Sequence, residues 1–245
     1  MTSIWSDEET DWPTLLHTAL DGCGMRAVYQ PIIDLTRGVT VGYEALIRFV
    51  GYPERNPGPW FAAARRHGLN APLQAAALRA GLADRDTLPR GCFLSVNLDP
   101  GVLHSPEVQA VWQEQRDLRG LIVELTQDTD DHPALHRLRT AGATIATDST
   151  LTHLHPTMIK LDRALITGIH HDPAKQAHIA ALTDRHDARL IAVGIEHPAE
   201  LATLAGLRVP LGQGYHLGRP ARPWSPITES AGRALRPGPF AHTSR

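Results

Sequence analysis

The chain has 245 residues, of which 42% are hydrophobic and 20% are charged, and its formal net charge is -2. This balance is typical of a globular protein and indicates neither a nucleic-acid polymer nor a membrane as partner. No apolar run is long enough to span a membrane, and residues 1–12 lack the pattern of a signal peptide, so we expect a cytoplasmic protein. Cys23 and Cys92 lie far apart, and we expect thiols rather than a disulfide.

Strand-like and helix-like segments alternate along most of the chain. Residues 27–33 and 38–42 are typical of two strands joined by a hairpin turn at 34–38. The later helices are expected at 59–67, 71–86, 106–116, 133–139, 174–186 and 198–205, and the later strands at 92–97, 120–125, 143–147, 157–160, 188–193 and 207–210.

This repeated order predicts an α/β fold, namely a modified TIM-type (β/α)8 barrel. The hairpin at its start predicts that the first strand is antiparallel, unlike those of a standard all-parallel barrel. We expect the barrel domain to cover residues 24–226, after an N-terminal segment at 1–23 and before a flexible C-terminal tail at 227–245.

The segment 43–48 places a carboxylate and a guanidinium close together at the end of the second strand. Because side chains alternate along a strand, Glu44, Leu46 and Arg48 point to the same face. A carboxylate can bind a hard cation, and a guanidinium can bind a phosphate through two hydrogen bonds. A surface ion pair on an edge strand would give the same four-residue pattern.

Other polar residues fall at the carboxyl ends of the later strands, where barrels of this type carry their active sites. Each one alone is explained as well by a helix cap or a loop hydrogen bond. Their shared position predicts one common site around Glu44. These residues are Asn97, Glu124, Asp148, Lys160, Glu196 and Gln213.

Several short motifs, in this order, resemble those of the EAL family of cyclic-di-GMP phosphodiesterases, which is named for the Glu-Ala-Leu found here at 44–46. The similarity covers roughly residues 25–222. The matching motifs are Gln30-Pro31-Ile32, Glu44-Ala45-Leu46-Ile47-Arg48, Ser95-Val96-Asn97, Glu124-Leu125-Thr126, Lys160-Leu161-Asp162 and Gln213-Gly214-Tyr215.

The resemblance implies a divalent cation, Mg²⁺ or Mn²⁺, which activates the water that opens cyclic-di-GMP to linear pGpG. It implies that the metal ligands are Glu44, Asn97, Glu124 and Asp148. It implies that the catalytic residues are Glu44, Lys160, Glu196 and Gln213. It implies that the nucleotide contacts are Gln30, Leu46, Arg48, Asn97 and Tyr215.

The chain departs from the family pattern around the second metal. Ser149 and Val193 stand where the family has acids, and the stretch 148–160 is shorter than usual. Without these acids, the repulsion between two close cations is less well offset, so we expect one metal site and a weak second one. His153 and His155 could supply a replacement ligand, although ordinary loop histidines would look the same.

The sequence is therefore compatible with three functions. The first is a degenerate EAL domain that binds cyclic-di-GMP, a partner protein or both, with weak or no hydrolysis. The second is an active metal-dependent phosphodiesterase that opens cyclic-di-GMP or a related phosphodiester. The third is a purely protein-binding module. A second copy of the chain is a further candidate partner, because members of this family have a dimer interface next to the altered loop.

Overall fold

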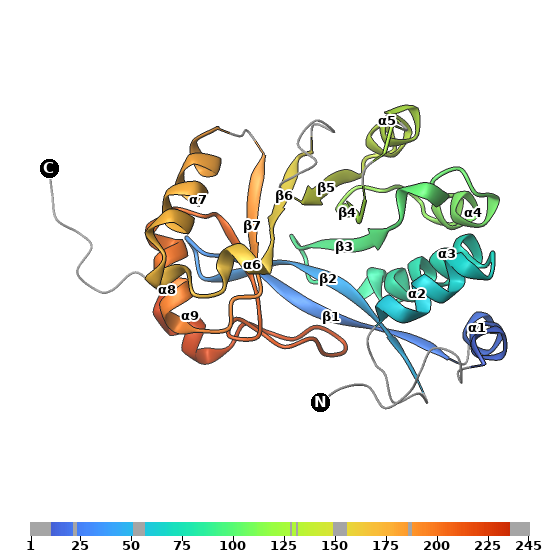
Figure 1. Cartoon of the computed structure of the whole chain (residues 1–245), viewed down its shortest axis with the longest axis horizontal. Coiled ribbons are helices and arrows are strands. Elements are labelled where there is room, and N and C mark those ends of the chain that lie inside the picture. Colours follow the sequence, from blue (N-terminus) through green and yellow to red (C-terminus); the bar gives the residue numbers. More distant parts are fainter. Residues whose placement is uncertain are drawn as a thin grey trace, which may run out of the picture.

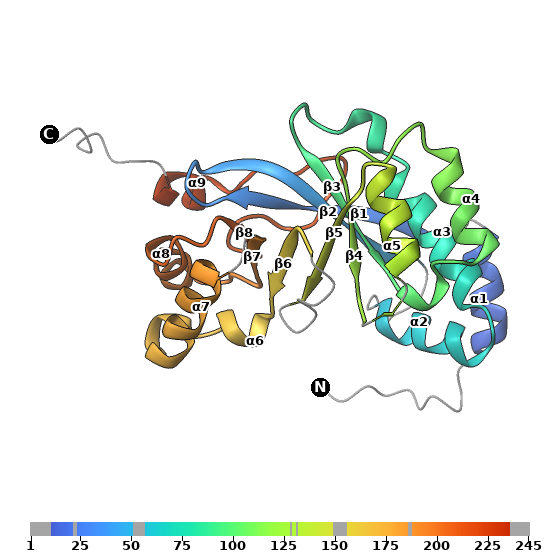
Figure 2. The ribbon, with the colours of Figure 1, turned by 90° about the horizontal axis from the view of Figure 1, so that it is seen from above.

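The computed structural model describes residues 11–21, 24–50, 57–127, 129–130, 132–148, 156–185 and 188–235. Its strands close into one barrel in sequence order (Figures 1 and 2). They are β1 (Met25–Asp34), β2 (Val39–Phe49), β3 (Phe93–Leu98), β4 (Leu121–Leu125), β5 (Thr144–Asp148), β6 (Met158–Leu161), β7 (Arg189–Val193) and β8 (Leu211–Gln213).

The predicted antiparallel first strand is confirmed. β1 runs antiparallel to both β2 and β8, and the remaining neighbours are parallel. The turn between β1 and β2 forms because the Asp34 carboxylate accepts hydrogen bonds from the backbone N–H groups of Thr36 and Arg37. Gly38 then takes a φ of +64°, which a residue without a β-carbon adopts at little cost.

Helices cover the outside of the barrel (Figure 1). They are α1 (Trp12–Leu20), α2 (Pro57–Arg66), α3 (Asn70–Leu82), α4 (Pro106–Glu114), α5 (His132–Thr140), α6 (Arg163–Ile166), α7 (Pro173–Arg185), α8 (Pro198–Gly206) and α9 (Glu229–Leu235). The short 3-10 helices are η1 (Arg85–Thr87), η2 (Pro100–Val102) and η4 (Ile169–His171). No helix in the described ranges is long and apolar enough to cross a membrane.

Three helices, α1, α6 and α9, lie where the sequence analysis predicted none. α1 begins after Asp11, whose carboxylate accepts a hydrogen bond from the Thr14 N–H, and it buries Leu16 in an aromatic cluster with Trp60. α9 falls in the segment predicted to be a flexible tail, and it packs beside the tip of the β1–β2 hairpin (Figure 2). Both α1 and α9 are short, and their stability comes from tertiary packing that local sequence does not reveal.

An apolar layer fills the barrel interior and forms the floor beneath the predicted site. Its side chains come from β1 and from the last five strands, so the inward-facing positions are fixed by the strand period of two. They are Ile32, Ile122, Ala146, Met158, Ile191 and Leu211.

Candidate functional site

Several predicted site residues lie two positions along their strands from a residue of this apolar floor. Glu124, Lys160 and Gln213 each follow a floor residue by two positions, which keeps them on the inward face. On the antiparallel β1, Gln30 precedes its floor residue by two positions and pairs in register with Glu44. The barrel therefore brings these side chains together at the carboxyl end of its parallel strands, as predicted.

Glu44 lies at the centre of a hydrogen-bonded network and is only 6% exposed. Its Oε1 accepts a hydrogen bond of 2.8 Å from the Asn97 amide. Its Oε2 accepts one of 2.7 Å from the Gln213 amide, which also donates to the Gln30 carbonyl at 3.2 Å. Because every one of these side chains is held by another, the Glu44 carboxylate is fixed in one orientation.

Lys160 supplies the positive charge of the network. Its Nζ lies 3.1 Å from Glu44 Oε2 and 2.7 Å from Glu124 Oε2. The three side chains are between 8% and 15% exposed, so both ion pairs are shielded from solvent. One ammonium is thus shared by two carboxylates in the interior of the barrel.

The pKa values follow from this arrangement. Burial acts to raise the pKa of Glu44, but Lys160 and the Asn97 and Gln213 amides outweigh it and hold that pKa below its usual range. Burial, together with the charge of Glu44, raises the pKa of Glu124 to about 7 despite Lys160. Burial would lower the pKa of Lys160, but the two carboxylates raise it above its ordinary value.

Glu196 follows β7 on a loop, and its carboxylate forms an ion pair of 2.7 Å with Arg163. The loop is held by Glu200, a buried residue of α8 that the sequence analysis missed. The Glu200 carboxylate accepts hydrogen bonds from the backbone N–H groups of Gly168, Glu196 and His197. The signal in the sequence was the spacing of an acid four residues after Glu196, at the third position of a helix.

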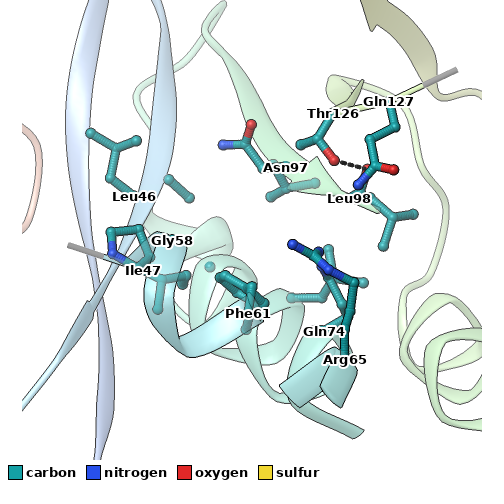
Figure 3. A pocket seen from close by; sticks show the side chains of 16 residues that line it. Leu46, Ile47, Gly58, Phe61, Arg65, Gln74, Asn97, Leu98, Thr126 and Gln127 are labelled. Carbon is teal, nitrogen blue, oxygen red and sulfur yellow. Dashed lines mark hydrogen bonds between the residues drawn. The ribbon is translucent and has the colours of Figure 1, made fainter. Parts of the chain in front are cut away.

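Two cavities flank the Glu44–Asn97 hydrogen bond. The first, of about 450 Å³, lies between the ends of β2 and β3 and the helices α2 and α3 (Figure 3). Leu46, Phe61 and Leu98 contribute apolar walls, and Asn97 and Arg65 contribute polar ones. The first cavity can accept a flat, largely apolar group that carries hydrogen-bonding atoms at its edge.

The second cavity, of about 270 Å³, is more polar. It is lined by Gln30, Glu44, Lys160, Arg163, Val193, Gly194, Glu196, Gln213, Gly214 and Tyr215. The Oε1 atom of Gln213 is buried there and has no hydrogen-bond partner among the described residues. An acceptor of this kind can accept a hydrogen bond from a water molecule or from a bound ligand.

Two of the remaining predicted residues lie at the edge of the second cavity or outside both cavities. Arg48 lines neither cavity, and its guanidinium donates to the Ile47 carbonyl at 2.9 Å. Tyr215 is 48% exposed at the edge of the second cavity, where the Arg219 guanidinium lies 4.6 Å from its ring centre. Asp148 ends β5 beside Lys160 in the strand register.

Other groups named in the sequence analysis lie outside what the structure describes. These are the Asp148 side chain, Cys23, Ser149, His153 and His155. Cys92 is a free thiol, and burial raises its pKa.

The donor set fits one hard divalent cation. Two carboxylates and one carboxamide, from Glu44, Glu124 and Asn97, lie within a single hydrogen-bonded network, and oxygen donors are those that Mg²⁺ and Mn²⁺ prefer. No cluster of three or more His, Cys, Asp or Glu side chains that could hold a metal occurs within the described ranges. A complete site would therefore need a ligand from water, from a nucleotide or from the β5 end of the barrel.

Comparisons with known proteins agree with this fold. An uncharacterized signaling protein of Caulobacter vibrioides is 29% identical over 219 residues, which are 79% of this chain and 27% of that protein. The probable cyclic di-GMP phosphodiesterase PdeB of Escherichia coli is 26% identical over 227 residues, which are 82% of this chain and 43% of PdeB. The chain thus spans less than half the length of these curated relatives.

A solved structure has the same architecture. The EAL domain of FimX from Xanthomonas citri, in complex with c-diGMP, superposes with a TM-score of 0.74 at 20% sequence identity, over 86% of this chain and 93% of that one. At this identity the likeness is one of fold. The model of the EAL domain family matches residues 15–220, and the chain belongs to that family.

Proposed function

We propose that this chain binds cyclic-di-GMP across the two cavities and hydrolyses it weakly or not at all. The proposal is supported by membership of the EAL family and by two relatives, one named as a probable cyclic di-GMP phosphodiesterase and one solved with c-diGMP bound. Among the described residues, the side chains around Glu44 offer amides and cations that can form hydrogen bonds with a base and a phosphate.

The observation that carries the proposal is the position of the Glu44–Asn97 hydrogen bond. Asn97 lines the first cavity and Glu44 lines the second, so a ligand that enters both must pass this pair. The first cavity suits a nucleobase, whose faces are apolar and whose edges form hydrogen bonds. The second cavity, with two cationic side chains and two amides, suits the adjoining phosphate.

Glu44 and Glu124 would hold a divalent cation through their carboxylates, with Asn97 as the amide donor. When bound, such a cation lowers the pKa of a water molecule and stabilises the charge that develops on a phosphodiester. Lys160 forms ion pairs with both carboxylates, and Gln213 Oε1 offers an acceptor for a hydrogen bond from a water molecule. Together these residues would position the cation and a water molecule for hydrolysis of a phosphodiester.

Weak turnover is proposed because this chain lacks two acids that the family resemblance implies beside a second metal. Val193 contributes an apolar side chain where related members have a carboxylate, and Ser149 replaces a second acid. Losing two acids removes the groups that would offset the repulsion between two close cations. Binding does not depend on them to the same extent, since both cavities and the exposed cation Arg163 remain.

Calorimetry with cyclic-di-GMP, in EDTA and with Mn²⁺, tests the binding part. We expect saturable binding by the wild type and clearly weaker binding by Asn97→Leu, which breaks the contact between the two cavities. The exposed variant Arg233→Ala is the matched control and should bind as the wild type does. Absence of any binding by the folded wild type would refute the proposal.

A turnover assay with Mn²⁺ tests the second part. We expect little conversion of cyclic-di-GMP to pGpG over hours. Rapid conversion that disappears in Glu44→Ala would instead establish an active phosphodiesterase. That alternative is favoured by one observation, namely that the Glu44 and Glu124 carboxylates both contact Lys160 while the Asn97 amide contacts Glu44.

A further inference from the structure

Arg163 was not among the residues that the sequence analysis assigned to the site. It is the first residue of α6, directly after β6 and Asp162, and it lines the second cavity together with Lys160 and Glu44. Its guanidinium Nη2 lies 2.7 Å from Glu196 Oε1. The Arg163 side chain is 61% exposed, and that of Glu196 is 35% exposed. The charge of Arg163 therefore lies where the cavity meets solvent.

The path of the Arg163 side chain is set by Gly194. Gly194 has a φ of +79°, and a β-carbon built on it would come within 2.6 Å of Arg163 Cγ. The stem of Arg163 thus lies directly over the backbone of Gly194, next to Val193 in the cavity wall. Because Gly194 has no β-carbon, it leaves room for this stem, and the ion pair with Glu196 holds the guanidinium at the cavity.

The two cations of the cavity differ in how strongly they are already bound. Lys160 is shielded and neutralised by two carboxylates, so it can give up little of its charge to a ligand. Arg163 has an exposed ion pair with Glu196, and exposed pairs contribute only about 0–1 kcal/mol. If another anion replaces Glu196 as the partner of Arg163, little free energy is lost with the Arg163–Glu196 ion pair.

We propose that Arg163 binds a phosphate of the bound dinucleotide at the mouth of the second cavity and releases Glu196 to do so. This inference rests on the proposed function, because it names the group that receives one phosphate of cyclic-di-GMP. A guanidinium suits this role since its planar fork donates two parallel hydrogen bonds to phosphate oxygens. Glu196 then acts as a competitor that holds Arg163 in place while no nucleotide is bound.

The experiment is calorimetry with cyclic-di-GMP in EDTA, at low and at high NaCl concentration. We expect Arg163→Ala to bind about 10-fold to 100-fold more weakly than the wild type, as the loss of a charge-assisted hydrogen bond predicts. Arg163→Lys keeps the charge but loses the fork, and it should lie between the two. The binding of Arg163→Ala should also depend less on salt, because one screened contact is gone.

Glu196→Gln distinguishes a phosphate contact from a structural tie. If Glu196 competes with phosphate, Glu196→Gln binds cyclic-di-GMP several-fold more tightly than the wild type. If the ion pair only ties the two loops together, Glu196→Gln and Arg163→Ala weaken binding alike, and the proposal is overturned. Arg233→Ala removes a similarly exposed ion pair far along the chain, in α9, and should change affinity less than twofold.

The outcomes separate this inference from the proposed function. Wild-type affinity in a folded Arg163→Ala, checked by thermal melting, would overturn the role of Arg163 and leave cyclic-di-GMP binding intact. No binding by the wild type would overturn both. Because Arg163 is mostly exposed, its substitution is not expected to unfold the chain.

Discussion

Replacing Lys160 with methionine tests whether the barrel interior depends on one shared cation. Met is similar in length and apolar, so Lys160→Met removes the charge and leaves Glu44 and Glu124 buried beside each other. Breaking a buried ion pair by removing one partner costs about 3–5 kcal/mol. For a domain of this size, that loss lowers the melting temperature by about 6–20 °C.

The loss of stability in Lys160→Met should depend on pH. In Lys160→Met both carboxyl groups are buried without their cation, so their pKa values in the folded state lie above those in the unfolded state. The folded variant then binds more protons than the unfolded one, and its stability rises as the pH falls from 8 to 5. The deficit relative to the wild type should therefore be largest at pH 8 and clearly smaller at pH 5.

Thermal and urea unfolding at the two pH values measure this difference. Lys175→Met is the matched control, because the Lys175 ammonium donates only to the Ala164 and Thr167 carbonyls in the contacts described. Excess Mn²⁺ should restore Lys160→Met more than the control, since a cation bound by the two carboxylates replaces the missing charge. A deficit independent of pH, or one no larger than that of Lys175→Met, would refute this account of the site.

Three further predictions concern the surroundings of the site. Gly214→Ala should lower the free energy of unfolding by about 1–3 kcal/mol in urea titrations, because its β-carbon would meet the backbone of Ile195; an unchanged midpoint would contradict this. Burial works against ionisation of Glu200, but its backbone donors hold its pKa below the usual 4.5. Glu200→Gln should therefore lower the free energy of unfolding by about 1–3 kcal/mol at pH 7, and this difference should vanish as the pH falls through the pKa of the folded state. A difference that stays constant down to pH 3 would count against this account. Trp60→Ala should cost about 3–5 kcal/mol in thermal melts, because Trp60 stacks on Phe49 at 4.0 Å, and a loss under 1 kcal/mol would show that the ring is dispensable.

The barrel and its polar layer could be predicted from local patterns. Ile122 and Glu124, or Met158 and Lys160, are two residues apart on short apolar strands, and the strand period alone puts each pair on one face. The antiparallel start was visible because the turn at Asp34 is too short for a crossover helix. These features depend on nearest neighbours in the chain.

The parts that were missed depend on contacts between distant segments. Arg163 belongs to the site because its stem crosses Gly194, a residue in a different loop. Glu200 matters because it joins the loops of Gly168 and Glu196. Arg48, predicted to contact a nucleotide, lines neither cavity and donates to the Ile47 carbonyl. A sequence motif shows which residues are present, but the roles of Arg163 and Glu200 depend on contacts between loops that are distant in the sequence.

This division between strands and loops explains how binding and hydrolysis can separate in one barrel. Glu44 and Lys160 are on strands that the closed sheet holds in place, so their network forms whatever the loops contain. Val193 and Gly194, at the end of β7, and Arg163, at the start of α6, shape the wall of the second cavity. Under the proposed function, replacing acids beside a second metal would remove metal ligands without loosening the sheet, and Arg163 would still attract phosphate. Loss of turnover with retained affinity is therefore what this distribution of residues predicts.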